Sequence, residues 1–393
     1  MNLRLTLRVQ GGLLIFLAAM LLTPVPFSLA HPRAGAWHDG AFWAFLLASL
    51  IALAVGLALY RRFRTDDEMT YREGFAIVTF GWISYALFGG LPYLLAEVNG
   101  IRGFADAFFE AMSGFSTTGS TVITGLERVP PSILFWRAMT QWLGGMGIIV
   151  LSLAILPFLG VGGMQLFEAE SPGPTKDRLS PRIQDTAKVL WGVYAILTLT
   201  EALLLWAGGM TAFESLCHAF TTMATGGFST RDASIAAFGG YTHVVIGMFM
   251  LLAGVNFSLH FHTLRGRPGR YWQSEEFRFY LALIASSTAV ITVLIVLQRD
   301  LPGHALVKFR DAAFQTVSMM TTTGYATADF ETWPAMAQYL LVALMFVGGC
   351  AASTGGSIKV VRILLLSKHA FLQLSRLIHP REVRSLKLDH KPV

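Results

Sequence analysis

The chain has 393 residues, of which 54% are hydrophobic and only 14% are charged, and its mean hydropathy is +0.55. Soluble domains of this length carry more charge and less apolar side chain, so the composition excludes that class. The net charge of +6 would suit a nucleic-acid partner, but the basic residues gather in short segments between apolar stretches. That distribution is typical of a membrane protein.

Eight apolar stretches are long enough to cross a bilayer core of roughly 30 Å. In chain order they are 11–30, 39–60, 74–97, 133–160, 187–208, 241–263, 277–298 and 335–366. Basic residues lie before the first stretch and after the second, fourth, sixth and eighth, so the positive-inside rule places these segments and both termini in the cytoplasm. Ser28-Leu29-Ala30 also resembles a signal-peptidase site, but a retained hairpin with the second stretch is the simpler arrangement.

Three segments repeat one pattern, in which a helix too short to span is followed by a threonine-glycine loop and a long apolar helix. The segments are 106–121, 213–230 and 311–327. Aligned on their glycines, the loops contain Thr117, Thr118 and Gly119, then Ala224, Thr225 and Gly226, then Thr322, Thr323 and Gly324. Glycine lets a backbone direct its carbonyls toward an ion and replace the hydration shell. The repeats therefore predict a cation filter built from re-entrant pore helices on the outer side.

Each loop has a simpler interpretation as a helix C-cap with a left-handed glycine. Three such loops on one predicted side of the membrane favour the pore. Acidic residues lie near the starts of the short helices and either enrich cations at the outer mouth or only suit the helix dipole. They are Asp106, Glu110, Glu214 and Asp311.

The eighth stretch is interrupted by glycines and hydroxyl residues, which are rare together in a lipid-facing helix. They are Gly348, Gly349, Ser353, Thr354, Gly355, Gly356 and Ser357. We expect a non-helical segment here, with a small-residue packing face between helices as the alternative. A phosphate-binding loop is excluded because Gly356 stands where its lysine should be. Lys359 and Arg362 either face an inner vestibule or extend to the membrane surface.

An enzyme is not indicated. Intramembrane enzymes place paired acids, histidines or a serine-lysine pair inside their spans, whereas Glu201 is the only acidic residue well inside a predicted span and has no suitably spaced companion. Cys217 and Cys350 lack metal-ligand spacing and are expected to be buried apolar residues. No cofactor is expected in the chain itself.

The loops STTGST, MATGGFST and TTTGYAT, together with GGCAASTGGSIKVVR at 348–362, resemble the Trk-type potassium uptake proteins of the Trk/Ktr/HKT superfamily. The two additional N-terminal spans resemble its TrkH branch. The resemblance implies an all-α polytopic membrane protein with helix–pore helix–filter loop–helix repeats around a pseudo-symmetric pore, and K⁺ held by the filter loops. It also implies that the glycine-rich segment is a gate, that the protein is a homodimer in the inner membrane, and that a cytosolic nucleotide-binding TrkA-type subunit docks on it.

The family has four such repeats, whereas three are found here. The predicted segments are a hairpin at 1–66, pore repeats at 67–165, 166–268 and 269–370, and a basic tail at 371–393. The function this predicts is potassium uptake. The alternatives are a sodium-permeable relative, or a non-conducting chain that acts by binding partner subunits.

Overall fold

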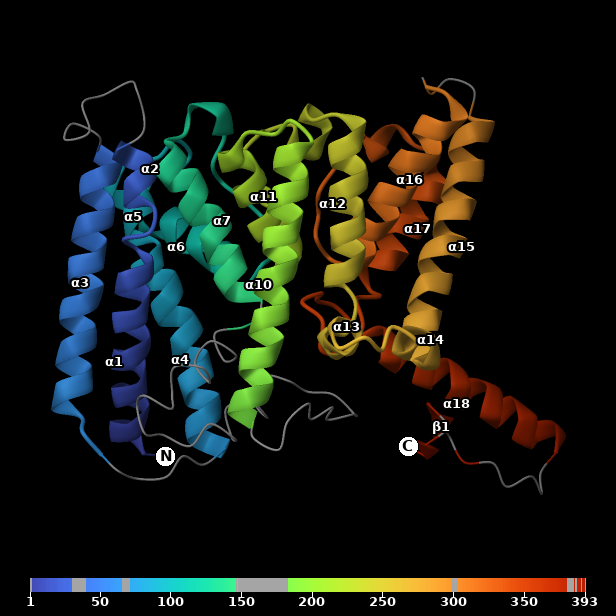
Figure 1. Ribbon diagram of the computed structural model, residues 1–393, viewed down its shortest axis with the longest axis horizontal. Coiled ribbons are helices and arrows are strands. Elements are labelled where there is room, and N and C mark those ends of the chain that lie inside the picture. Colours follow the sequence, from blue (N-terminus) through green and yellow to red (C-terminus); the bar gives the residue numbers. More distant parts are fainter. Residues whose placement is uncertain are drawn as a thin grey trace. The chain divides into compact units, whose positions relative to one another are not determined.

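The computed structural model describes residues 2–29, 40–65, 71–145, 147, 183–298, 301, 303–379, 385, 387–389 and 391–392. These residues are almost entirely helical (Figure 1). The chain divides into two compact units, Met1–Ser234 and Ile235–Val393, and each is described by itself. The division falls inside the predicted second repeat, and the repeat boundaries remain predictions.

In the first unit α1, α3 and α4 lie side by side (Figure 1). The shorter helix α6 packs on α4, α7 packs on α6, and α11 packs on α7. Its helices are α1 Leu3–Met20, α2 Val25–Leu29, α3 Gly40–Arg62, α4 Tyr71–Gly89, α5 Leu91–Leu95, α6 Phe104–Phe115, η2 Leu126–Arg128, α7 Pro131–Gly145, α10 Ile183–Ala207 and α11 Ala212–Met223. Helix α1 begins at a side-chain cap, because Asn2 accepts hydrogen bonds from the amides of Arg4 and Leu5.

Glycines bring α1 and α3 into backbone contact. A Cβ on Gly11 would lie 2.6 Å from the Tyr60 nitrogen, and one on Gly56 would lie 2.9 Å from the Gly11 carbonyl oxygen. Apolar helices in a membrane gain little from burying apolar surface against each other, so close approach through small residues holds them together. The predicted N-terminal hairpin is therefore a tightly packed helix pair.

In the second unit α15 packs on α16 and α17 (Figure 1). The elements of this part of the chain are η3 Ser234–Ala237, α12 Gly240–Ala253, α13 Phe257–Leu264, α14 Arg270–Gln273, α15 Glu275–Leu297, α16 Ala305–Met320, η4 Phe330–Thr332, α17 Ala335–Met345, α18 Val360–Ile378, and the paired antiparallel strands β1 Lys387–Leu388 and β2 Lys391–Pro392.

Two predicted spans are not continuous helices. The sixth bends by 103° between α12 and α13, and Asn256 starts α13 by accepting a hydrogen bond from the Ser258 amide. The eighth stops at Met345 and resumes at Val360. Hydropathy reports apolar content over a window and does not detect a break that polar or small residues produce within it. The non-helical backbone expected at Ser353–Ser357 is confirmed.

Among the described residues, five helices are long and apolar enough to cross a membrane, or six if the bent pair is counted as one span. The five are Leu3–Leu29, Gly40–Arg62, Arg72–Leu95, Lys188–Ala207 and Glu275–Leu297. They match the first, second, third, fifth and seventh predicted stretches. The fourth is described as α7 to Gly145 and at Gly147, and the rest of it, like the basic residues 176–182 and 381–384, lies outside the described residues. The protein is an all-α polytopic membrane protein.

Candidate functional site: three helix-loop motifs and a glycine-rich loop

The three predicted pore helices are α6, α11 and α16, and all three end in the same way. In the first, the Thr117 amide donates to the Gly114 carbonyl at 3.0 Å and the Thr118 amide donates to the Ser113 carbonyl at 2.9 Å. This pair of bonds is a Schellman motif. The corresponding donors are Thr225 and Gly226 after α11, and Thr322 and Thr323 after α16. The recurrence predicted from the loop sequences is present in the backbone.

The backbone dihedrals align the loops in a register that differs from the sequence alignment at one place. Residues with positive φ are Thr117 and Gly119 in the first loop, Thr225 and Gly227 in the second, and Thr322 and Gly324 in the third. Gly227 at φ 77°, and not Gly226, therefore corresponds to Gly119 at 78° and Gly324 at 82°. The sequence alignment, which pairs Gly226 with Gly119 and Gly324, predicts a left-handed dihedral at Gly226, and this prediction is wrong.

Sequence could have shown this register. A hydroxyl residue precedes the left-handed glycine by six positions in every loop, as in Ser113 and Gly119. The other two pairs are Thr221 with Gly227 and Ser318 with Gly324. The second loop has two adjacent glycines, and an alignment based on the Thr-Gly pair alone selects Gly226 when Gly227 is the left-handed one.

The three left-handed threonines bear on whether these loops are only helix caps. A Schellman cap ordinarily has glycine at this left-handed position, yet Thr117, Thr225 and Thr322 occupy it at φ between 51° and 61°. A β-branched residue there is a steric outlier and costs roughly 1–3 kcal/mol. Capping alone would favour glycine, so a threonine in all three loops indicates a second requirement.

Gln141 of α7 holds the second loop next to the first. Its side-chain amide donates to the Gly226 carbonyl oxygen at 2.8 Å and accepts from the Phe228 amide at 3.1 Å. A Cβ on Gly226 would lie 2.4 Å from Gln141 Cδ, and a Cβ on Gly119 would lie 2.1 Å from the Gly226 carbonyl oxygen. The close approach of Gln141 thus requires glycine at position 226. The close approach of Gly119 to the Gly226 carbonyl oxygen shows that the first two predicted filter loops are in contact.

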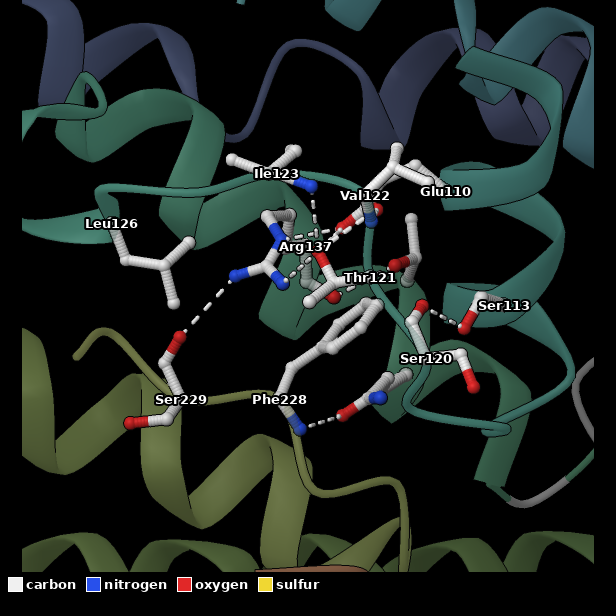
Figure 2. Close-up of polar contacts among 12 residues, drawn as sticks. Glu110, Ser113, Ser120, Thr121, Val122, Ile123, Leu126, Arg137, Phe228 and Ser229 are labelled. Atoms are coloured by element: carbon white, nitrogen blue, oxygen red, sulfur yellow. Dashed lines mark hydrogen bonds and ion pairs between the residues drawn. The ribbon is translucent and has the colours of Figure 1, made fainter. Parts of the chain in front are cut away.

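A buried ion pair contacts the segments that follow the first two loops (Figure 2). Arg137 Nε lies 2.8 Å from Glu110 Oε1, and their side chains are 1% and 0% exposed. Glu110 also accepts from the Thr121 hydroxyl and the Val122 amide. Arg137 reaches the second loop by donating to the Ser229 carbonyl at 3.2 Å, and it lies over the Phe228 ring. One salt bridge therefore ties α6, α7 and both loops together.

Equivalent positions of the other two pore helices carry similar anchors. Glu110, His218 and Gln315 each lie five residues before the end of their helix and are fully buried. His218 Nε2 lies 3.2 Å from the Ser229 hydroxyl, and Gln315 donates to the Ala328 carbonyl at 3.4 Å. Each anchor thus contacts the segment that leaves its own loop. Sequence analysis missed this set because three different side chains perform the same task.

The other acidic residues that were predicted near the helix starts have local partners. Glu214 lies 2.6 Å from Arg231 and Asp311 lies 2.9 Å from Arg310, while Asp106 accepts from the Arg102 amide. Burial raises the pKa of Glu214, but hydrogen bonds from Arg231 and Thr211 and the charge of Arg231 outweigh it and leave this pKa below its ordinary value. Asp106 and Glu214 lie in the first turns of α6 and α11, so their contacts support the helix-start interpretation over a free acidic mouth. Asp311 lies in the middle of α16, and the expectation that it is near a helix start is wrong.

In the second unit, the glycine-rich loop is fastened to the break between α12 and α13. The Cys350 amide donates to the Gly254 carbonyl at 2.8 Å, the Phe257 amide donates to the Ala352 carbonyl at 3.1 Å, and the Thr354 hydroxyl donates to the Ala253 carbonyl at 3.1 Å. The loop also meets the third predicted filter loop, because the Gly356 amide donates to the Thr322 hydroxyl at 2.7 Å. It is therefore bonded to the helix break on one side and to Thr322 on the other.

Lys359 has a position that neither sequence-based interpretation describes. Its ammonium group donates to the Ser353 carbonyl at 3.3 Å and to the Gly355 carbonyl. The backbone carbonyls of the glycine-rich loop thus have a cationic donor within the same unit. A Cβ on Gly348 would lie 1.8 Å from the Gly356 carbonyl oxygen, so the close approach of these two backbone segments requires glycine at position 348.

Comparison with known proteins gives consistent results. A family model described as TrkH, cation transport protein, matches residues 42–393. The Trk system potassium uptake protein TrkH of Escherichia coli (strain K12) is 44% identical over 395 residues, which is 100% of this chain and 80% of that protein. TrkG of the same strain, also a Trk system potassium uptake protein, is 34% identical over 97% of this chain and 78% of its own length.

A solved structure is also similar. The crystal structure of the potassium transporter TrkH from Vibrio parahaemolyticus has a TM-score of 0.86 and 38% sequence identity, and the match covers 100% of this chain and 80% of that one. Sequence, family model and structure therefore agree over nearly the whole chain. The chain belongs to the TrkH family of cation transport proteins.

Proposed function

We propose that this chain takes up K⁺ across the bacterial inner membrane through a filter formed by the loops at 117–119, 225–227 and 322–324. The observation that carries the proposal is the threefold recurrence of a left-handed threonine two residues before a left-handed glycine. The relatives at 44% and 34% identity are potassium uptake proteins by name, which supports K⁺ as the ion.

The geometry supplies the physical reason. Carbonyl oxygens that replace the hydration shell must be held in a fixed arrangement. The Schellman bonds, the Gln141 contact with Gly226 and the Glu110–Arg137 pair hold the first two loops from several sides. Each pore helix also directs the negative end of its dipole toward its loop, which favours a cation there. Ala224, the cap of α11, lies one position before the left-handed threonine and belongs to the cap.

We further propose that the glycine-rich loop at 348–357 restricts ion passage. Its contact with Thr322 places it directly against one predicted filter loop. The Lys359 ammonium group holds two of its carbonyls, so a cation in this region would compete with Lys359 for the same oxygens. Movement of the loop would then open the path and release the lysine.

The family resemblance further suggests a homodimer with both termini in the cytoplasm and a TrkA-type nucleotide-binding ring as its partner. The basic segments at 176–188, 265–278 and 376–387 would lie on the cytoplasmic side, where an acidic ring or anionic lipid could meet them. Co-purification of the chain with a TrkA-type subunit, compared with a variant in which these basic residues are glutamine, tests the contact.

Growth at low external K⁺ tests the function directly. The chain is expressed in a host that lacks its own potassium uptake systems, alone and joined to the fourth repeat of a relative. Rescue in either form, lost on Gly324→Val, supports the proposal. Rescue that is equally strong with Gly324→Val, or no rescue in either form despite insertion in the membrane, contradicts it. Rescue with higher Na⁺ than K⁺ permeability would identify a sodium-permeable relative.

A further inference from the structure

A cavity of about 470 Å³ lies in the first unit, apart from the predicted filter loops. Its walls come from α2, from the segment 126–131 with the start of α7, from the start of α11, and from Thr230 and Arg231. The volume is sufficient for a small molecule or for one polar group of a larger ligand. Nothing in the proposed ion path uses it.

Two hydroxyl groups in the cavity wall have unused hydrogen-bonding capacity. Ser28 and Thr230 are 2% and 6% exposed, and neither hydroxyl has a hydrogen-bond partner. Leaving a buried hydroxyl unpaired costs roughly 1–3 kcal/mol, and each can donate one hydrogen bond by rotating about its C–O bond. Each oxygen is buried in its present rotamer, so a rotation about χ1 that turns the hydroxyl into the cavity would let a ligand with acceptor oxygens satisfy both.

The charges around the cavity leave one cation available. Arg231 is paired with Glu214, and Glu127 accepts a hydrogen bond from the Asp232 amide. The exposed guanidinium of Arg128 lines the same cavity, and among the residues that the structure describes it has no ion pair or side-chain hydrogen bond. A guanidinium binds two oxygens of a phosphate group at once.

The remaining wall selects among phosphate-bearing ligands. Leu134, Val129 and Phe213 give it an apolar part suited to an alkyl group. The carboxylates of Glu127 and Glu214 also line it and would repel a dianion, so a singly charged phosphodiester fits better than a phosphate monoester. Ser28 lies one residue before the end of the first apolar span, which is the level at which lipid headgroups lie.

We propose that this cavity binds a phosphodiester, with Arg128 on its non-bridging oxygens and the hydroxyls of Ser28 and Thr230 as further donors. The chemistry is that of an outer-leaflet phospholipid headgroup. The proposal does not rest on potassium transport, since none of these residues belongs to the predicted filter or the glycine-rich loop. It assigns a binding site to the outer end of the first unit.

The test uses the full chain purified in detergent. Native mass spectrometry measures retained phosphatidylglycerol and phosphatidylethanolamine, and thermal unfolding is followed with each lipid and with inorganic phosphate. Arg128→Gln, and the double variant Ser28→Ala with Thr230→Val, should lower lipid occupancy about tenfold, which is roughly 1.4 kcal/mol. Arg128→Lys should retain part of it.

Two variants outside the cavity wall are matched controls. Arg102→Gln removes an exposed arginine of the same unit, and Ser132→Ala removes another buried hydroxyl that lacks a partner. Both should leave occupancy unchanged. Stabilisation by lipid that exceeds any effect of inorganic phosphate supports the phosphodiester headgroup, and stabilisation by inorganic phosphate alone would overturn it. Equal losses in Arg128→Gln and Arg102→Gln, or no lipid and no phosphate effect in the parent chain, would overturn the proposal.

Discussion

At the residue scale, the three left-handed glycines differ in what surrounds them. A Cβ on Gly324 would meet nothing within 4 Å, whereas a Cβ on Gly119 would collide with the Gly226 carbonyl oxygen. A side chain at Gly324 therefore tests backbone strain alone, and one at Gly119 tests strain together with displacement of the second loop. Substitutions at these two glycines therefore measure the effect of backbone strain and the effect of loop displacement separately.

Gly324→Ser should raise Na⁺ permeability relative to K⁺ without loss of folding, because a residue with a Cβ costs roughly 1–2 kcal/mol in this conformation and the loop relaxes away from it. Gly119→Ser should have the same effect and also reduce expression. Gly209→Ser is the matched control, since Gly209 has φ +97° and open space outside the loops. Reversal potentials measured in a conducting form check the ratio. The same ratio in Gly324→Ser and Gly209→Ser would argue against a filter.

The Glu110–Arg137 pair leads to a stability prediction. Arg137→Met or Glu110→Gln should lower the free energy of unfolding by about 3–5 kcal/mol, because each leaves an uncompensated buried group. The double variant should lose less than the sum of the two. Asp311→Asn, which breaks the more exposed pair with Arg310, should cost less than about 1 kcal/mol. Thermal unfolding in detergent measures all four. Equal costs for the two pairs would show that burial does not decide the effect.

At the element scale, the glycine-rich loop is held at both ends and by Lys359. Its backbone contains two left-handed residues that are not glycine, Ala352 at φ 52° and Ser357 at φ 58°. Such conformations persist only where surrounding contacts enforce them. A loop that stores strain is suited to change conformation when one of the contacts that hold it, here the ammonium group of Lys359, is removed.

Lys359→Met should raise ion flux in a four-repeat conducting form, because the loop carbonyls lose their cationic donor and the loop loosens. Deletion of 352–355 should raise flux further. Arg362→Met is the control, since this exposed arginine lies one turn later on α18. Flux through vesicles of known protein content is the readout. Unchanged or lower flux in a folded, inserted deletion variant would favour a helix-packing role for the loop.

At the scale of the whole molecule, the predicted topology requires that successive polar segments alternate between the two sides of the membrane. Arg102 precedes α6 and Arg267 follows α13, so one is expected outside and the other in the cytoplasm. Both native cysteines are buried, so they should react little with a thiol label. The topology can be tested without altering any predicted filter residue.

Arg102→Cys should react with a membrane-impermeant maleimide added to intact cells, and Arg267→Cys should react only after the membrane is opened. The unsubstituted chain should label weakly under both conditions, because Cys217 and Cys350 are 2% and 1% exposed. Labelling intensity on gels gives the comparison. If Arg267→Cys reacts in intact cells, the positive-inside assignment is inverted.

The amino-acid sequence alone determined the class of protein, five of the membrane-spanning helices and the presence of three repeated loops. These features depend on local composition and short-range spacing: twenty apolar residues form a span whatever packs beside them. The non-helical segment at 353–357 was predictable for the same reason, since several glycines and hydroxyl residues weaken a helix locally.

Only the tertiary structure decided the bend before α13 and the partners of Glu110, Gln141 and Lys359. The close contact that requires a glycine at position 226 depends on the side chain of Gln141, which lies 85 residues earlier in the chain. Local spacing cannot report such a contact. The role of Glu110 is likewise set by Arg137, which the fold brings to it from α7. The sequence does not show whether an acidic residue of a short helix faces water or an arginine.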